Sequence, residues 1–205
     1  MKTLIIALLL LANASGAHAS TLTLTPVVEG FIRDIPKDGI GDFSTVAWLR
    51  HGNFTGYWAE DRGIVEFDLR GLGLVRRAHL VARENFNSIR EPVALSLHAY
   101  RGDGILSLTD FAEGTPLGET VHELGGRLEL DATDFVNEAI SLRYDFIGFN
   151  LRQDSVTMAG VVEYEPSYLE IIPGSSAVPE PGSIWLMGAA VVGLYRLRKR
   201  SPALC

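Results

Sequence analysis

The chain has 205 residues and a net charge of −7, and its only cysteine, Cys205, is the last residue. Between the two ends, residues 20–177 hold 24 acidic and 13 basic residues, a net charge of −11 with histidine neutral. Such an acidic region repels nucleic acid and anionic membrane surfaces, so we exclude nucleic acid as a partner. Because it has no thiol, it can form no internal disulfide, and we expect it to be indifferent to the redox state of its compartment.

The first 19 residues have the pattern of a secretory signal peptide. A basic start, Met1-Lys2, precedes an apolar run over residues 3–11, and Ala17-His18-Ala19 supplies the small-x-small pattern that signal peptidase accepts. The run is too short to span a bilayer unaided. We therefore predict cleavage after Ala19, with a buried N-terminal helix as the alternative.

Residues 20–173 are enough chain for one domain with a full core. Several segments alternate apolar and polar residues with a period of two, which places one face of a strand against a core. The strongest predicted strands are Thr21–Val28, Val46–Arg50, Gly63–Leu69, Ala78–Arg83, Val93–Tyr100, Gly126–Leu130, Phe146–Arg152 and Tyr168–Ile172. A flexible linker over residues 174–177 follows.

One segment departs from this alternation. Phe135, Val136 and Ala139 stand at helical spacing within residues 134–140, and Thr133 is a plausible N-cap. About eight or more short strands with one short helix predict an all-β fold, an antiparallel β-sandwich of jelly-roll type.

Residues 178–200 change character sharply. Pro179-Glu180-Pro181 is followed by an apolar stretch, Ile184–Tyr195, for which we predict a hydrophobic helix. The basic residues Arg196, Arg198, Lys199 and Arg200 come next and would stay on the cytoplasmic side, with the domain in the periplasm. Twelve helical residues reach only about 18 Å, well short of a hydrocarbon core of about 30 Å. This stretch fits a transient retention signal in the inner membrane better than a permanent anchor.

The tripeptide, apolar run and basic cluster, in that order, closely resemble the PEP-CTERM sorting signal. That resemblance implies a Gram-negative host that makes exopolysaccharide. It also implies recognition of Pro179-Glu180-Pro181 by a membrane-embedded exosortase, which cuts near the tripeptide and delivers the protein to the cell surface or extracellular matrix. An ordinary tail anchor that is never processed is the alternative.

The central region resembles DNRLRE-type β-sandwich domains and related carbohydrate-binding modules. The matching stretches are Gly30–Arg33, Arg62–Leu69, Arg77–Val81, Glu129–Thr133 and Ser167–Ile171. Glu29 stands where those domains often have Asp. The resemblance implies a non-catalytic sandwich associated with the cell wall or with glycans, which in some members binds polysaccharide.

Aromatic residues around a glycine-bounded turn form the best candidate glycan-binding site. Trp48, Tyr57 and Trp58 would stack on sugar faces, and Glu60 and Arg62 would bind hydroxyl groups. Because aromatic residues are usually core residues, we favour the simpler interpretation that Trp48 and Trp58 pack in the core.

Metal binding and catalysis have little support. Asp34, Asp38 and Asp42 could gather around Ca²⁺, but their spacing does not match an EF-hand loop, and a solvated turn is the better interpretation. No nucleophile elbow, metalloprotease motif or cysteine nucleophile is present, so we expect no enzyme and no cofactor. The favoured function is an exported, exosortase-sorted surface or matrix protein that contacts polysaccharide. The alternatives are a secreted polysaccharide-processing hydrolase and a purely structural matrix subunit.

Overall fold

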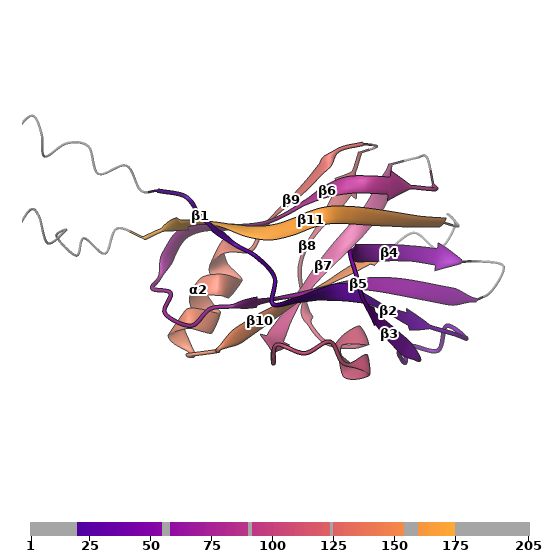
Figure 1. Ribbon diagram of the computed structural model, residues 1–205, viewed down its shortest axis with the longest axis horizontal. Helices are drawn as coiled ribbons and strands as arrows, with labels where there is room; N and C mark the ends of the chain where they lie inside the picture. The colour runs from indigo at the N-terminus through magenta and orange to yellow at the C-terminus, as the bar shows by residue number, and fades with distance from the viewer. Residues whose placement is uncertain (1–19, 55–57, 90–91, 124, 154–159, 175–205) are drawn as a thin grey trace, which may run out of the picture. The chain divides into compact units, whose positions relative to one another are not determined.

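The computed structural model describes residues 20–54, 58–89, 92–123, 125–153 and 160–174. They form antiparallel strands, one 3₁₀ turn and one α-helix (Figure 1). The elements are β1 (Leu22–Leu24), β2 (Val28–Asp34), β3 (Phe43–Val46), β4 (Leu49–Phe54), β5 (Ala59–Asp68), β6 (Val75–Asn87), β7 (Val93–Gly102), η2 (Leu108–Phe111), β8 (Thr115–His122), β9 (Arg127–Asp131), α2 (Thr133–Ser141), β10 (Phe146–Gln153) and β11 (Gly160–Pro173).

The strands make two layers. The first has the order β3-β2-β5-β10-β7-β8, and the second has the order β4-β11-β6-β9, with β1 also paired to β11. The layers are continuous where β4 meets β5, since Gly52 pairs with Asp61 and Phe54 pairs with Ala59. β4 pairs only with residues 59–61 of β5, and β10 pairs with residues 63–68. The rest of β4 therefore pairs with β11 in the second layer.

The main core lies between the layers. From the first layer, alternate residues such as Val65, Phe67 and Phe149 point into it and are buried, and Leu80 and Leu169 come from the second. The rings of Phe67 and Phe149 meet edge to face with centroids 6.1 Å apart. The alternation along β5 therefore gives the register predicted from the sequence.

The opposite face of the first layer is also covered. Ile32, Ile64, Tyr100 and Phe111 form a second, smaller buried cluster, against which Leu106 packs. Phe111 and Leu106 belong to the segment between β7 and β8. The even-numbered residues of β5 are therefore largely removed from water, although the sequence pattern suggested a solvated face.

Helix α2 begins one residue earlier than predicted, and its cap differs. Thr133 is the first helical residue and Ala132 is the N-cap, so the prediction of Thr133 as N-cap was wrong. The Thr133 hydroxyl instead accepts a hydrogen bond from the backbone N–H of Ala78 at 3.0 Å, while the Asp131 carboxylate accepts the Thr133 N–H at 2.9 Å. The hydroxyl therefore joins the helix to β6.

The predicted all-β fold class, an antiparallel sandwich of jelly-roll type with one short helix, is confirmed. β8 was missed. The predicted strand Thr21–Val28 is interrupted at residues 25–27, between β1 and β2, and the predicted strand Val46–Arg50 is broken at residues 47–48, between β3 and β4. The signal peptide, the linker from residue 175 and the predicted helix over 184–195 lie outside the described residues. Within the described part of the chain, no helix is both long and apolar enough to cross a membrane.

Candidate functional site

Trp58 lies in the turn between β4 and β5, and three quarters of it (75%) is exposed. Its φ angle is +53°, in the left-handed region that residues with a side chain rarely adopt. Trp48 lies just before β4 and is 46% exposed. The interpretation that these two tryptophans pack in the core was therefore wrong, because the turns that carry them lie outside both hydrophobic clusters.

The structure does not bring all the predicted stacking residues close together. Trp48 precedes β4 and Trp58 follows it, and a six-residue strand is about 20 Å long. The two tryptophans consequently mark opposite ends of β4 and cannot form one platform. Tyr57 lies outside the described residues.

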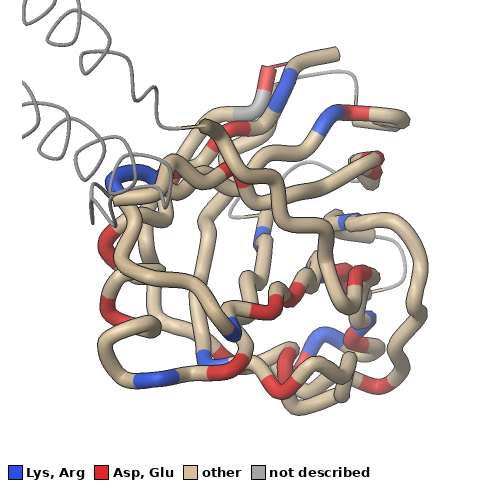
Figure 2. Tube along the Cα trace, turned by 60° about the vertical axis from the view of Figure 1, so that its left-hand side comes forward, with Lys and Arg blue, Asp and Glu red and all other residues tan. Residues whose placement is uncertain are grey.

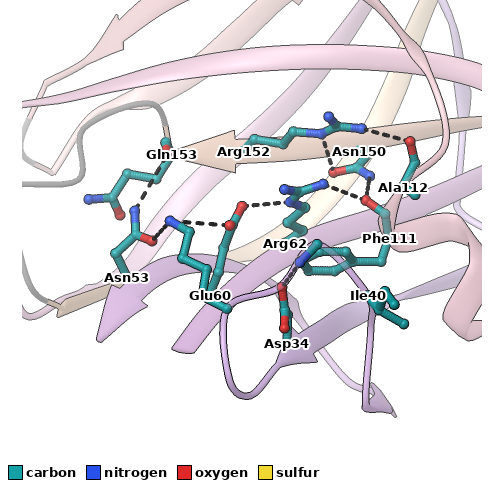
Figure 3. A network of polar contacts seen from close by, with 12 residues as sticks. Asp34, Ile40, Asn53, Glu60, Arg62, Phe111, Ala112, Asn150, Arg152 and Gln153 are labelled. Carbon is teal, nitrogen blue, oxygen red and sulfur yellow. Dashed lines mark hydrogen bonds and ion pairs between the residues drawn. The ribbon is translucent and has the colours of Figure 1, made fainter. Parts of the chain in front are cut away.

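Trp58 is tied to a charged group on another loop. Its carbonyl accepts a hydrogen bond from the backbone N–H of Lys37 at 2.6 Å. The Lys37 ammonium lies 3.2 Å from the Glu60 carboxylate and donates to the Asn53 side-chain oxygen at 2.8 Å (Figure 3). Glu60 and Asn53 are buried, whereas a third of the Lys37 side chain is exposed, so Lys37 is the accessible member of this group.

Arg62 continues these contacts along β5. Its guanidinium lies 2.6 Å from Glu60, donates to the Phe111 carbonyl at 2.7 Å, and sits over the Phe111 ring, 3.9 Å from the centroid. Asn150 donates to the same carbonyl at 3.0 Å, and Arg152 donates to the Glu113 carbonyl at 2.7 Å. We call Lys37, Asn53, Glu60, Arg62, Asn150 and Arg152 the polar row (Figure 3).

The polar row combines predicted and unpredicted residues. Glu60 and Arg62 were predicted and lie together, two residues apart on one face of β5. Lys37, Asn150 and Arg152 were missed, since pairing between distant segments brings them to β5. The period-two alternation of a strand predicts that residues 60, 62, 64 and 66 share one face of β5. It does not predict which segment covers that face.

The loop that carries Lys37 is ordered by the residues considered for calcium. Asp34 accepts hydrogen bonds from the N–H groups of Asp38, at 3.1 Å, and Gly39, at 2.7 Å. Asp38 accepts the Ile40 N–H at 3.0 Å, and Asp42 accepts the Ile35 N–H. Among the described residues, no three acidic or histidine side chains are arranged to hold a metal ion. These carboxylates therefore cap the backbone of the loop.

Asp61 points to the other face of β5 and does not form a carboxylate pair with Glu60. It is fully buried and contacts the Arg33 guanidinium at 2.5 and 2.7 Å and that of Arg50 at 2.7 Å. Both guanidinium groups also lie over the Phe54 ring, at 4.7 and 5.7 Å. This cluster neutralises a buried charge and fixes the strands around the site.

A further buried carboxylate lies on the same face of β5 as the polar row. Glu66 accepts hydrogen bonds from the Tyr100 hydroxyl at 2.8 Å and from the N–H groups of Asp103, at 3.1 Å, and Gly104, at 2.6 Å. Burial raises the pKa of Glu66 above its ordinary value of 4.5, although these hydrogen bonds oppose the shift. Glu66 holds the segment after β7 against the sheet.

Comparisons with known proteins identify one sequence feature. Residues 177–200 match the PEP-CTERM protein-sorting motif, which confirms the predicted sorting signal. No curated protein matches the chain in sequence.

Solved structures of similar fold include a xylan-binding module, CBM15, with a TM-score of 0.41 and 13% identity, covering 76% of this chain and 97% of that module. They also include the xylanase Xylanase10C (mutant E385A) from Cellvibrio japonicus, in complex with xylopentaose, with a TM-score of 0.40 and 13% identity. That match covers 76% of this chain and 29% of the xylanase. With TM-scores below 0.5, these two likenesses carry no argument about this chain.

Proposed function

We propose that this is an exported, non-catalytic surface or matrix protein whose β-sandwich binds a neutral polysaccharide at Trp58 and the adjoining Lys37. The PEP-CTERM motif supports the export and surface sorting. Signal peptidase removes residues 1–19, and an exosortase acts near Pro179-Glu180-Pro181 during a transient stage at the inner membrane.

The observation that carries the binding proposal is the exposed indole of Trp58 in a left-handed backbone conformation. Such a conformation costs a non-glycine residue about 1–3 kcal/mol, and an exposed tryptophan contributes little burial energy in return. Strain of this kind concentrates at binding and active sites. An indole exposed to solvent offers the flat apolar surface on which the C–H face of a sugar ring stacks.

The polar row supplies the second element of sugar recognition. The Lys37 ammonium carries three donors, and its contacts with Glu60 and Asn53 hold it beside the turn of Trp58. A sugar hydroxyl is a good acceptor for this ammonium. Because the buried carboxylate of Glu60 fixes Lys37 before any ligand arrives, little conformational entropy is lost on binding.

The charge of the domain selects among polysaccharides. Acidic residues are distributed over strands and loops throughout the described chain (Figure 2), and residues 20–177 carry a net charge of −11. An acidic polymer is repelled at long range, whereas a neutral one is not. Binding to a neutral polysaccharide should therefore change little with ionic strength.

A retention experiment tests this function. The exported chain is mixed with neutral and acidic polysaccharides at low and at high salt, and the bound fraction is measured. We expect retention by at least one neutral polysaccharide, equal at the two salt concentrations. Retention by acidic polymers alone, or by none of the panel, would refute the proposed function.

A further inference from the structure

β3 is an uncovered edge strand. Its four residues, Phe43-Ser44-Thr45-Val46, are all exposed, and in the described part of the chain it pairs with β2 alone. Phe43 is 40% exposed and Val46 is 73% exposed. The other side of this strand is therefore open to another backbone.

The register with β2 determines which backbone groups point outward. Thr45 pairs with Phe31, and the N–H of Ala47 donates to the Glu29 carbonyl at 3.1 Å. Hydrogen-bonded residues alternate along an antiparallel strand, so Thr45 shares the orientation of Ala47. Ser44 and Val46 consequently direct their N–H and C=O groups away from β2.

β3 also lacks the features that protect other edges. β8 contains Pro116 and Glu119, and β9 carries charge at Arg127, Glu129 and Asp131. β3 has no charge, no proline and no bulge, in a domain with a net charge of −11. Charged residues and proline are common devices against pairing between edges, and of such devices β3 has only its short length of four residues.

We propose that β3 is a self-association surface, and that its partner is β3 of a second copy of this chain. Backbone hydrogen bonds between two copies can form only where the outward-facing residues, Ser44 and Val46, lie opposite one another. This condition favours a two-fold axis at Thr45. In this register Ser44 of each copy faces Val46 of the other, Thr45 faces Thr45, and four backbone hydrogen bonds form. Threonine opposite threonine is a favourable cross-strand pair.

β3 is an uncharged surface on which a second copy can pair without bringing like charges together. Two copies of so acidic a domain repel one another across most surfaces, and β3 brings no like charges face to face. Because β3 has no charged residue, two antiparallel copies of it can pair without repulsion between their side chains. Pairing would join the first layers of two molecules into one continuous sheet, the strand-addition mode of recognition. Because the contact is short, we expect weak association that grows with concentration at a surface.

Disulfide trapping tests the proposed axis. In the full chain with Cys205→Ser, Thr45→Cys places two thiols at a non-hydrogen-bonded pair, where Cα atoms are about 4.5 Å apart, within the range of roughly 4.4–6.8 Å that a disulfide requires. The matched control is Ser141→Cys, at an exposed site in α2. After mild oxidation we expect about tenfold more covalent dimer for Thr45→Cys than for the control, equivalent to about 1.4 kcal/mol.

A further substitution separates specific pairing from random collision. Val46→Lys, added to Thr45→Cys, places a charge beside the axis and should lower the dimer yield about tenfold, to that of the control, with an unchanged melting temperature. Equal yields for Thr45→Cys and Ser141→Cys would overturn the proposal. A yield unaffected by Val46→Lys would overturn it as well.

Discussion

The backbone N–H of Lys37 donates a hydrogen bond to the carbonyl of Trp58 at 2.6 Å, which ties the loop after β2 to the turn between β4 and β5. Twenty-one positions separate these residues in the sequence. The same loop is capped by the Asp34 carboxylate and anchored by the Lys37 ammonium against Glu60. The exposed indole is thus attached to a rigid framework.

Replacement of Trp58 tests the backbone strain at this turn. Glycine adopts positive φ without penalty, whereas alanine meets the same steric conflict as tryptophan. We expect Trp58→Gly to be more stable than Trp58→Ala by about 1 kcal/mol, in spite of the greater flexibility of glycine in the unfolded chain. Urea unfolding of the two variants measures the difference. Trp58→Ala equal to or more stable than Trp58→Gly would show that the left-handed conformation is not present.

Phe67 tests the register of β5. Its side chain is fully buried and meets Phe149 edge to face, so Phe67→Ala should destabilise the protein by about 3–5 kcal/mol. The control is Val46→Ala on the exposed edge strand, which should change stability by less than about 0.5 kcal/mol. Chemical denaturation gives both values. A Phe67→Ala variant as stable as its control would mean that Phe67 of β5 does not point into the core.

The alternation in β5 predicted that Phe67 is buried, because a period of two needs only the local sequence. It could not predict that Glu66 is buried as well. That depends on the segment after β7, whose Asp103 and Gly104 donate to the carboxylate from 37 and 38 residues away. Gly148 contributes too, since a Cβ there would lie 2.1 Å from the ring of Tyr100, whose hydroxyl donates to Glu66.

The candidate site, too, could be predicted from the sequence only in part. Trp58, Glu60 and Arg62 were recognisable as aromatic and charged residues around one turn. The partners that orient them come from the loop after β2, from β4 and from η2, and no local pattern connects those segments. The exposure of Trp48 and Trp58 ran against the general preference of aromatic residues for the core, because both lie in turns.

Glu66 predicts a pH dependence of stability. Its pKa is raised by burial above 4.5, so the folded state binds more protons than the unfolded state between pH 4.5 and the folded pKa. The contribution of this group to stability therefore falls as pH rises through that window. Glu66→Gln cannot titrate, so the melting temperature of the variant minus that of the wild type should increase from about pH 4 to about pH 8. Buried carboxyls that do not interact with Glu66, such as Glu29, are common to both proteins and cancel. A difference independent of pH would contradict the raised pKa.

The sorting signal predicts the C-terminus of the mature protein. Cleavage near Pro179-Glu180-Pro181 removes the basic cluster of residues 196–200 together with Cys205. Mass spectrometry of surface material from the native host should find peptides from residues 160–174 but none from residues 196–205. Intact C-terminal peptides in that material would contradict processing and favour a permanent tail anchor.

The central claim is tested most directly by calorimetric titration of a soluble oligosaccharide, prepared from a neutral polysaccharide that the wild type retains, into three proteins. These are the wild type, Trp58→Ala and Trp48→Ala, and all three are first shown to be folded by their melting curves. Trp48 is the matched control, an exposed tryptophan at the other end of β4.

We predict that Trp58→Ala weakens binding by about 2 kcal/mol, roughly thirtyfold in Kd, and that Trp48→Ala leaves Kd unchanged. A folded Trp58→Ala variant that binds as tightly as the wild type would contradict the account.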